Sequence, residues 1–275
     1  MPSAEKYDAL LDLLAGLESV LVAYSGGVDS TLLAFATHAV LGDRCCAVLA
    51  TSDTYPETEA VAARLLAQKL GFRLIEVETC ELADPKFTAN NSDRCYHCKS
   101  ELFGLLGRVA EAQGLAHVAD GNNVDDLSDH RPGRRAAQEL GVVSPLSAVG
   151  LAKEEIRELA RELGLPNWNK PSMACFASRF PYGVRITDDG LARVSAAEQS
   201  VRDLGISQFR VRAHGPVARI EIAPHELDAA WNLREQIASG VRRAGFAYAS
   251  LDLDGYRTGS MNEVLSPEVT GAESA

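Results

Sequence analysis

The sequence of 275 residues lacks any apolar run long enough to cross a bilayer, and its first residues, MPSAEKYDALLDLL, do not form a signal peptide. These absences predict a cytoplasmic protein with no membrane partner. Disulfide frameworks are rare in that reducing compartment. The six cysteines are therefore read as buried packing, metal ligands or nucleophiles.

An excess of positive charge is also missing, because 27 lysines and arginines face 38 aspartates and glutamates, for a net charge of −11. Nucleic-acid-binding proteins normally present a basic face, so this acidity argues against a nucleic-acid partner. The acidic excess lies almost wholly before residue 166, and nearly all cations after it are arginine. Arginine suits bidentate contacts with phosphate and carboxylate, although a solvated surface explains these arginines equally well.

The chain has no internal repeat and no low-complexity block. Its first part alternates short apolar runs, which predict buried strands, with longer helical patterns that glycines end. The predicted strands are 18–24, 45–51, 72–78 and 116–121. This alternation predicts an α/β fold, a doubly wound parallel sheet, whose ligands bind at the carboxyl ends of the strands.

The pattern changes after a loop at 166–186. A helix at 189–205, a β-hairpin at 208–222 and a further helix and strand predict a small C-terminal α+β domain. The expected organisation is an α/β domain at 1–165, a loop with a cysteine at 166–186, an α+β domain at 187–258 and a mobile tail at 259–275.

A candidate phosphate loop, YSGGVDST at 24–31, joins the first strand to the first long helix. Its two glycines allow a sharp turn that points successive N–H groups inward, and the helix start adds further donors for an anion. The loop lacks the Gly-Lys-Ser/Thr ending of a Walker A motif and does not match G-x-G-x-x-G. It predicts a site for phosphate or pyrophosphate.

SGGVDS resembles the pyrophosphate loop (PP-loop) of the N-type ATP pyrophosphatases, which implies ATP with Mg²⁺, adenylation of the substrate and release of pyrophosphate. DGNNVDD at 120–126 is similar to the GTNxDD element of synthetases in this superfamily, with Asn122 in place of threonine, although an Asx-rich turn is the alternative. The resemblance assigns ATP to Ser25, Gly26, Gly27, Asp29, Ser30, Ser52, Gly121 and Asp125, and Mg²⁺ to Asp29 and Asp126.

The cysteines divide into two groups. Cys45, Cys46 and Cys80 lie in or beside predicted strands and are read as buried small hydrophobes. Cys95 and Cys98 have C-x-x-C spacing at a helix start, without the second pair that a four-cysteine zinc site needs. With Cys175 they could hold three corners of a [4Fe–4S] cluster, or they could be a helix-start pair without metal.

Cys175 lies in NKPSMACFASRFPYG, at 169–183, a loop bounded by prolines and a glycine. Loops on a rigid scaffold often carry chemistry. Lys170 and Arg179 nearby would favour the thiolate, which is the nucleophilic form of cysteine. Cys175 is therefore the candidate catalytic residue, and an inert loop cysteine is the alternative.

These motifs, together with AKEEIRELARELGLP at 152–166, occur in the order found in LarE-type sulfur transferases, and the similarity runs over about 18–258. The resemblance implies adenylation of a carboxylate of pyridinium-3,5-biscarboxylic acid mononucleotide, followed by transfer of sulfur from Cys175 to give a thiocarboxylate. Family members with three cysteines are thought to use a sulfide-donating [4Fe–4S] cluster, and Cys95, Cys98 and Cys175 fit that kind. Homo-oligomerisation is also implied.

The implied substrate carries a phosphate and two carboxylates, and Ser178, Arg179, Arg210 and Arg212 are the candidates for binding it. Arg210 and Arg212 are two apart on a predicted strand and therefore share a face. Glu198 and Glu221 are weaker candidates for a metal or orienting role.

Three other functions remain open at this point. A PP-loop tRNA thiolase would also use a C-x-x-C pair and a distant cysteine, but the net charge and the missing RNA-binding module disfavour it. An ammonia-using ligase related to NAD or GMP synthetase would leave the three thiols without a role. A non-enzymatic ATP sensor would bind ATP without releasing pyrophosphate.

Overall fold

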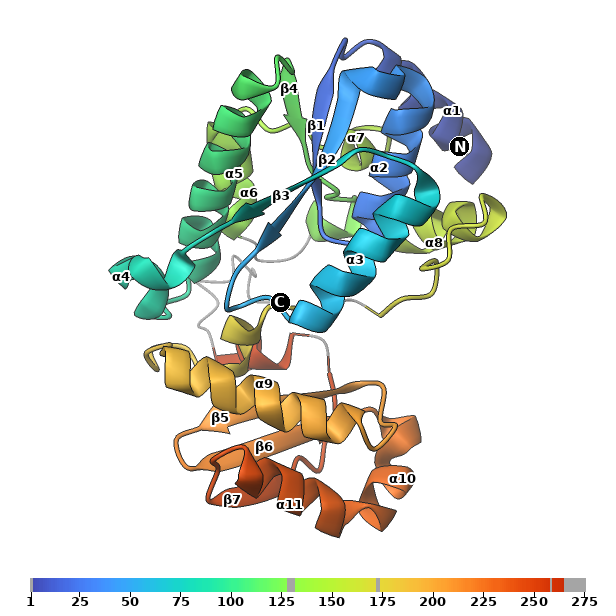
Figure 1. The fold of residues 1–275 in the computed structure, drawn as a ribbon. Coiled ribbons are helices and arrows are strands. Elements are labelled where there is room, and N and C mark those ends of the chain that lie inside the picture. Colours follow the sequence, from blue (N-terminus) through green and yellow to red (C-terminus); the bar gives the residue numbers. More distant parts are fainter. Residues whose placement is uncertain (1, 128–131, 172–173, 258, 265–275) are drawn as a thin grey trace, which may run out of the picture. The chain divides into compact units, whose positions relative to one another are not determined.

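The computed structural model describes residues 2–127, 132–171, 174–257 and 259–264 (Figure 1). The chain divides into two compact units. The first comprises Met1–Glu81 and Cys95–Met173, and the second comprises Leu82–Arg94 and Ala174–Ala275. Most of the predicted mobile tail lies outside the described residues. Within the described ranges, no helix has the length and apolar character needed to cross a membrane.

The first unit is built on a four-stranded, fully parallel sheet in the order β3-β2-β1-β4. Its strands are β1 (Val20–Tyr24), β2 (Cys45–Thr51), β3 (Leu74–Glu78) and β4 (His117–Ala119). A single parallel bridge between Ala119 and Val143 continues the sheet beyond β4. The predicted parallel α/β fold is confirmed.

The strand order creates a switch point between β1 and β4. The chain runs outward from β1 through β2 to β3, and then returns to the other side of β1 as β4. In such sheets the crevice for a ligand opens at the carboxyl ends of the two strands that flank the reversal. The loops that leave these strands are 25–27 and 120–124, which contain the predicted ATP motifs.

Helices cover both faces of this sheet (Figure 1). One face packs on α1 (Ser3–Ala15), α2 (Val28–Leu41), α3 (Glu57–Leu70), α7 (Pro145–Ala148) and α8 (Lys153–Glu162). The other packs on α5 (Arg94–Ala112) and α6 (Pro132–Glu139). Side chains alternate along each strand, so Cys45 and Cys46 enter opposite layers and both are buried.

Their predicted core position is thus confirmed, whereas that of Cys80 is wrong. Cys80 is exposed because it lies beyond the end of β3, an edge strand whose side chains are only partly covered. Its backbone N–H donates to a carboxylate oxygen of Glu101 at 2.9 Å.

The second unit contains a three-stranded sheet in the order β5-β6-β7. The predicted hairpin is β5 (Phe209–His214) paired antiparallel with β6 (Val217–Ile222), and β7 (Tyr248–Leu251) runs parallel to β6. A parallel pair needs a crossover, which here comprises α10 (Leu227–Asn232) and α11 (Arg234–Arg243). Helix α9 (Asp188–Arg202) packs with α11 and against β5.

A segment from the middle of the chain, Leu82–Arg94, belongs to the second unit and includes the short helix α4 (Pro85–Thr88). Asn90 attaches it there. Its side-chain amide donates to the carbonyl oxygens of Phe180, Pro181 and Val184 at 3.3, 2.8 and 3.0 Å. The segment therefore supports the loop that follows Cys175.

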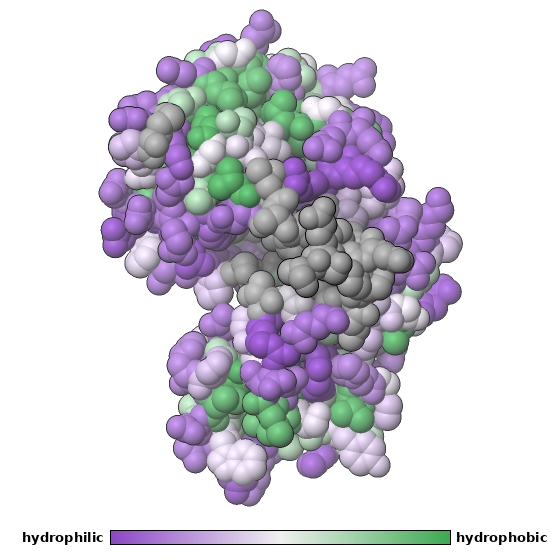
Figure 2. All heavy atoms as spheres, turned by 180° about the vertical axis from the view of Figure 1, so that it is seen from behind, coloured by the Kyte–Doolittle hydropathy of each residue, from purple (hydrophilic) through white to green (hydrophobic). Residues whose placement is uncertain are grey.

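Figure 2 shows a face of the molecule that is mostly hydrophilic, with apolar side chains gathered in small groups on both units. Scattered apolar residues of this kind are normal on a protein surface. Among the described residues, the large apolar side chains that are exposed are Val61, Leu65, Leu140, Trp168, Val184, Trp231, Tyr248 and Leu253.

Candidate active site

The phosphate loop lies between β1 and α2 and is tightened by its own hydroxyl groups. The Ser25 N–H donates to Ser30 Oγ at 3.2 Å, and Ser30 Oγ donates to the Gly27 carbonyl at 3.2 Å. Ser25 Oγ and Ser30 Oγ lie 3.2 Å apart. Helix α2 begins at Val28 with an N-terminus that adds unpaired N–H groups and the positive end of the helix dipole. This arrangement can bind a phosphate group without a charged side chain.

Two glycines are required at this loop for different reasons. Gly26 has φ of +65°, and a Cβ there would lie 2.7 Å from the Ala63 Cβ on α3. A Cβ on Gly121, which follows β4, would lie 3.0 Å from the Ser30 backbone nitrogen. Gly121 therefore lets the end of β4 approach the first turn of α2 closely. The structure thus brings the two predicted ATP motifs together across the switch point.

Ser52 lies at the carboxyl end of β2, in a turn stabilised by its own side chain and carbonyl. Its Oγ lies 3.0 Å from Thr54 Oγ1, and its carbonyl accepts the Tyr55 N–H at 3.0 Å. The Tyr55 hydroxyl donates to the Ser25 carbonyl at 2.8 Å. The Tyr55 hydrogen bond thus connects this turn to the phosphate loop, and the predicted contact of Ser52 with ATP stays a prediction.

An acidic group adjoins the phosphate loop. Asp29 accepts a hydrogen bond from the Asn123 amide at 3.3 Å and forms an ion pair with the Lys153 ammonium. Asp126 accepts the Asn123 backbone N–H at 3.0 Å, and Asp125 accepts the Lys153 backbone N–H at 2.7 Å. Asn123 and Lys153 therefore connect the three carboxylates to one another.

The C-x-x-C pair lies on α5 in the first unit, where Cys95 is exposed and Cys98 is half-buried. Cys98 Sγ lies 3.8 Å from a carboxylate oxygen of Glu81, to which the Thr79 hydroxyl donates at 3.0 Å. Half-buried Cys175 belongs to the second unit, at the start of the 3₁₀ helix η4 (Phe176–Arg179). The three cysteines thus come from two units, and a shared cluster stays a prediction.

The backbone around Cys175 is fixed by a buried arginine. The Arg179 side chain is fully buried and forms two bonds to Glu198, at 2.7 and 3.0 Å. It also donates to the carbonyl oxygens of Ala174 and Cys175 at 2.7 and 3.1 Å, and Ser178 Oγ donates to the latter at 2.8 Å. Arg179 therefore orders the loop that carries the thiol.

The two cations expected to favour the Cys175 thiolate each have a carboxylate partner. Arg179 is ion-paired with Glu198, and Lys170 is ion-paired in the first unit with Glu59 at 2.6 Å. Their effect on the Cys175 thiolate stays a prediction.

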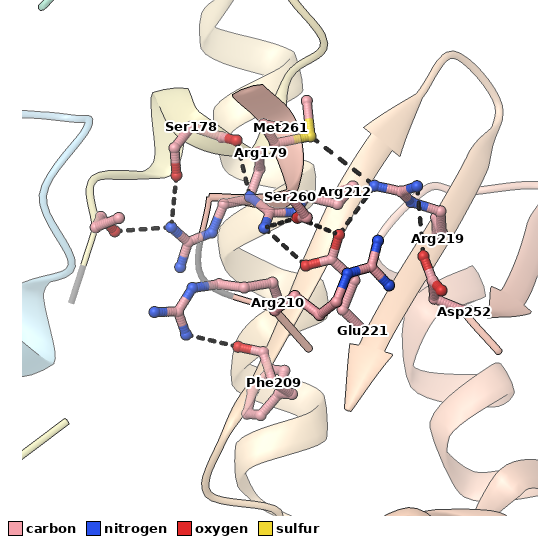
Figure 3. Close-up of polar contacts among 12 residues, drawn as sticks. Ser178, Arg179, Phe209, Arg210, Arg212, Arg219, Glu221, Asp252, Ser260 and Met261 are labelled. Atoms are coloured by element: carbon pink, nitrogen blue, oxygen red, sulfur yellow. Dashed lines mark hydrogen bonds and ion pairs between the residues drawn. The ribbon is translucent and has the colours of Figure 1, made fainter. Parts of the chain in front are cut away.

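The remaining predicted substrate residues form a buried charge cluster on β5 and β6 (Figure 3). Arg212 donates to Glu221 at 2.7 Å and to the Ser178 carbonyl at 3.0 Å. Arg219 pairs with the same Glu221 at 2.9 Å and with Asp252 at 3.3 Å. The cluster therefore joins the β-hairpin to the loop of Cys175.

Arg210 lies on the same face as Arg212, as their spacing predicted, and both are buried. Its guanidinium lies 5.0 Å from the centre of the Tyr256 ring and donates to the Phe209 carbonyl at 2.7 Å. Burial lowers the pKa of Arg210, and repulsion from Arg179 and Arg212 lowers it further. Binding of the substrate's anionic groups by Arg210 and Arg212 stays a prediction.

Known proteins resemble this chain over nearly its whole length. It is 38% identical to the pyridinium-3,5-bisthiocarboxylic acid mononucleotide synthase of Lactiplantibacillus plantarum, over 96% of both chains. The chain belongs to this LarE family. It is also 43% identical to an uncharacterized protein of Synechocystis sp., over 95% of this chain and 98% of that one. Residues 13–100 match the family model described as NAD synthase, as expected for the PP-loop superfamily.

Membership of the LarE family identifies the chain as an ATP-dependent sulfur-transferring enzyme that uses Mg²⁺. A probable tRNA sulfurtransferase of Methanothermobacter thermautotrophicus is 28% identical, but over only 55% of this chain and 42% of its own length. The tRNA thiolase hypothesis therefore has only the partial similarity that a shared ATP-binding domain produces.

Two carboxylates beside the phosphate loop have the chemistry of Mg²⁺ ligands that act together with a bound nucleotide. In the part of the chain that the structure describes, no three His, Cys, Asp or Glu side chains are grouped to hold a metal by themselves. Mg²⁺ is commonly held by one or two carboxylates together with substrate phosphates. Asp29 and Asp126, both bonded to Asn123 beside the phosphate loop, fit that arrangement.

The sequence interpretation missed Lys153 and Asn123 as members of this site. A signal for Lys153 was available, because it opens helix α8, where the helix dipole makes a positive side chain unfavourable. A cation at that position indicates a compensating anion, which is Asp29 here. Asn123 lies in the DGNNVDD motif, but its role could not be predicted there. Its contact with Asp29 depends on how distant segments of the chain fold.

Proposed function

We propose that this enzyme converts a carboxylate of pyridinium-3,5-biscarboxylic acid mononucleotide into a thiocarboxylate at the expense of ATP. The observation that carries the proposal is the 38% identity, over 96% of both chains, to the synthase of the corresponding bisthiocarboxylic acid mononucleotide. The phosphate loop at 24–31 supports the first half-reaction, and the ordered loop of Cys175 supports the second.

The first half-reaction activates the carboxylate. A carboxylate oxygen attacks the α-phosphorus of ATP, the bond to the β-phosphate oxygen breaks, and pyrophosphate leaves. The N–H groups of the phosphate loop and of the first turn of α2 stabilise the charge that develops on this leaving group. Asp29 and Asp126 would hold Mg²⁺, which when bound neutralises phosphate charge.

The second half-reaction uses the acyl adenylate. The Cys175 thiolate attacks the acyl carbon, the bond to AMP breaks, and a thioester forms. Removal of the cysteine α-proton then cleaves the Cβ–S bond, whose electrons stay on sulfur. The products are a thiocarboxylate and a dehydroalanine at position 175. In the alternative route, Cys95, Cys98 and Cys175 would bind a [4Fe–4S] cluster that supplies sulfide, a ligand set that three thiols fit.

Recognition of the substrate belongs in this proposal to the arginine cluster of the second unit. The substrate carries one phosphate and two carboxylates, and Arg210 and Arg212 lie on one face of β5 as guanidinium donors suited to such anions. Ser178, Arg179 and Arg212 order the loop of Cys175 beside it. Homo-oligomerisation is proposed on family resemblance, and sedimentation velocity tests it.

The decisive experiment is anaerobic intact-protein mass spectrometry before and after incubation with ATP, Mg²⁺ and the biscarboxylated mononucleotide. Loss of the mass of H₂S at Cys175, in step with thiocarboxylate formation, is expected for the sacrificial route. Product without a change in protein mass would assign the sulfur to a cluster. In the Cys175→Ser variant, pyrophosphate release is expected to persist while thiocarboxylate disappears. Absence of pyrophosphate release from the parent protein would refute the proposed function.

A further inference from the structure

The segment 166–171, which follows α8 and ends the first unit, folds back onto the phosphate loop. The Asn167 amide donates to the Gly26 carbonyl at 3.1 Å and to Thr31 Oγ1 at 3.0 Å. The Lys170 ammonium donates to the same Gly26 carbonyl at 3.3 Å. Two side chains from one short segment therefore hold a single peptide group of the loop.

That peptide group determines the direction of a donor. In a trans peptide the C=O of one residue and the N–H of the next point in opposite directions. Fixing the Gly26 carbonyl therefore fixes the Gly27 N–H on the opposite side of the peptide. Gly26 has φ of +65°, and a glycine in this region turns easily unless its neighbours hold it. Asn167 and Lys170 provide that restraint.

Asn167 makes this contact while leaving its own side-chain oxygen without a hydrogen bond within the described ranges, and Lys170 is held in place by a second partner. Asn167 is only 9% exposed, and its Oδ1 is buried without a hydrogen-bond partner among the described residues. A buried unpaired oxygen needs an explanation. The orientation that leaves Oδ1 unpaired is the one that points both N–H groups at Gly26 and Thr31. Lys170 is held in turn by Glu59 of α3 at 2.6 Å.

We propose that Asn167 and Lys170 are positioning residues that set the pyrophosphate-binding geometry of the loop, and that segment 166–171 responds to its occupancy. In the sequence, this segment precedes Cys175 by only a few residues. This inference rests on the proposed use of residues 24–31 to bind the pyrophosphate moiety of ATP.

Trp168 supplies a reporter inside the segment. It is 38% exposed, and the Arg161 guanidinium lies 5.9 Å from the centre of its ring. The chain has two tryptophans, and the other, Trp231, is exposed on α10 in the second unit. In a Trp231→Phe parent, the emission therefore comes from Trp168 alone.

The test measures Mg²⁺-pyrophosphate and AMP binding by calorimetry in this parent and in its Asn167→Ala and Lys170→Met variants. AMP lacks the β- and γ-phosphates and serves as the internal control. Each variant is expected to weaken pyrophosphate binding about tenfold, with AMP affinity unchanged within about twofold. Lys170→Arg should recover part of the loss, and Lys69→Met, at an exposed lysine on α3, should behave like the parent.

Pyrophosphate should also shift the Trp168 emission of the parent, and the shift should be lost in Asn167→Ala. Equal pyrophosphate affinity in parent and variants would overturn the inference alone, while the proposed function stands. An equal loss of AMP and pyrophosphate affinity would show a general structural effect and also overturn it. Lys170→Met provides the same test if Asn167→Ala does not fold. A parent that binds neither ATP nor pyrophosphate would remove the proposed function itself.

Discussion

The two units contain candidate anion sites of opposite construction. In the first, the donors are backbone N–H groups and hydroxyls of a loop whose Ser25 is exposed. In the second, the donors are arginines in the protein interior. Arg179 and the carboxylate of Glu221 beside this cluster are both 0% exposed. A backbone nest binds phosphate without burying a charge, whereas buried arginines need carboxylate partners in order to fold.

This difference predicts where binding and stability can be separated. Removing a donor from the phosphate loop should reduce affinity with little effect on folding. Removing an ion-pair partner from the second unit should reduce stability, because the remaining charge stays buried. The substitutions below are ordered from the largest expected effect on stability to the smallest.

The largest effect is expected at the buried pair of Arg179 and Glu198, whose exposed fractions are 0% and 1%. Arg179→Met or Glu198→Leu should each lower the free energy of unfolding by about 3–5 kcal/mol, because each breaks the ion pair and leaves the other charge in the protein interior. The double variant should recover most of the loss. Denaturant titration measures it, and Arg257→Met, at an exposed surface pair, is the control. Additive losses in the double variant would contradict the interpretation.

The next effect is expected at Gly26. Gly26→Ala combines a left-handed backbone, at about 1–2 kcal/mol, with crowding against Ala63 at about 1–3 kcal/mol. Gly71→Ala is the matched control, because Gly71 has φ of +77° and open space around the added Cβ. Thermal unfolding should separate the two, and only Gly26→Ala should lose pyrophosphate affinity. Equal destabilisation would show that the contact with Ala63 is easily relaxed.

A smaller effect on stability is expected at Arg210. Burial and two neighbouring arginines lower the pKa of Arg210, so its protonated form is less favoured in the fold than in water. Arg210→Met should change the free energy of unfolding by less than about 1 kcal/mol, since relief of repulsion offsets lost contacts. Affinity for the mononucleotide should fall about tenfold or more. A loss of stability as large as that of Arg179→Met would contradict the assignment of Arg210 to the candidate anion site.

The smallest effect is expected at the ion pair of Lys6 and Glu155, 2.7 Å apart. The pKa of Glu155 is lowered mainly by its hydrogen bond to Lys6 and also by the Ala152 N–H. A lowered folded-state pKa stabilises the protein above the ordinary glutamate range, and this contribution is lost as pH falls through the lowered value. Lys6→Met should cost about 0.2–1 kcal/mol at neutral pH, because solvent screens the pair.

The measurement is the free energy of unfolding of the parent and Lys6→Met as a function of pH. The difference between them should disappear below the lowered pKa of Glu155. A difference that is independent of pH would assign the effect to packing of the lysine side chain against the Gly150 region, where its ammonium also donates to a carbonyl at 2.7 Å.

Residues that are close in sequence allowed much of the fold to be predicted. The apolar runs and glycine stops predicted the four parallel strands, and the alternation on both sides of His214-Gly215-Pro216 predicted the β-hairpin. The phosphate loop was identifiable because its glycines, hydroxyls and helix start are contiguous. The shared face of Arg210 and Arg212 followed from the two-residue period of a strand.

Other features depend on which distant segments meet. Lys153 contacts Asp29, Lys170 and Asn167 contact Gly26, and Leu82–Arg94 joins the second unit. The exposure of Cys80 likewise depends on β3 being at the sheet edge. No periodicity of neighbouring residues in the sequence predicts these contacts.

The sequence by itself determined the elements, the phosphate loop and the candidate thiol, because each depends on neighbouring residues and their periodicity. The tertiary structure decided which charges are paired. The sequence predicts that Arg179 and Lys170 favour the Cys175 thiolate and that Arg179 also binds the substrate, and the fold pairs them with Glu198 and Glu59. The physical reason is that burying a charge requires an opposite charge within contact distance, and only the folded chain determines which residue supplies it.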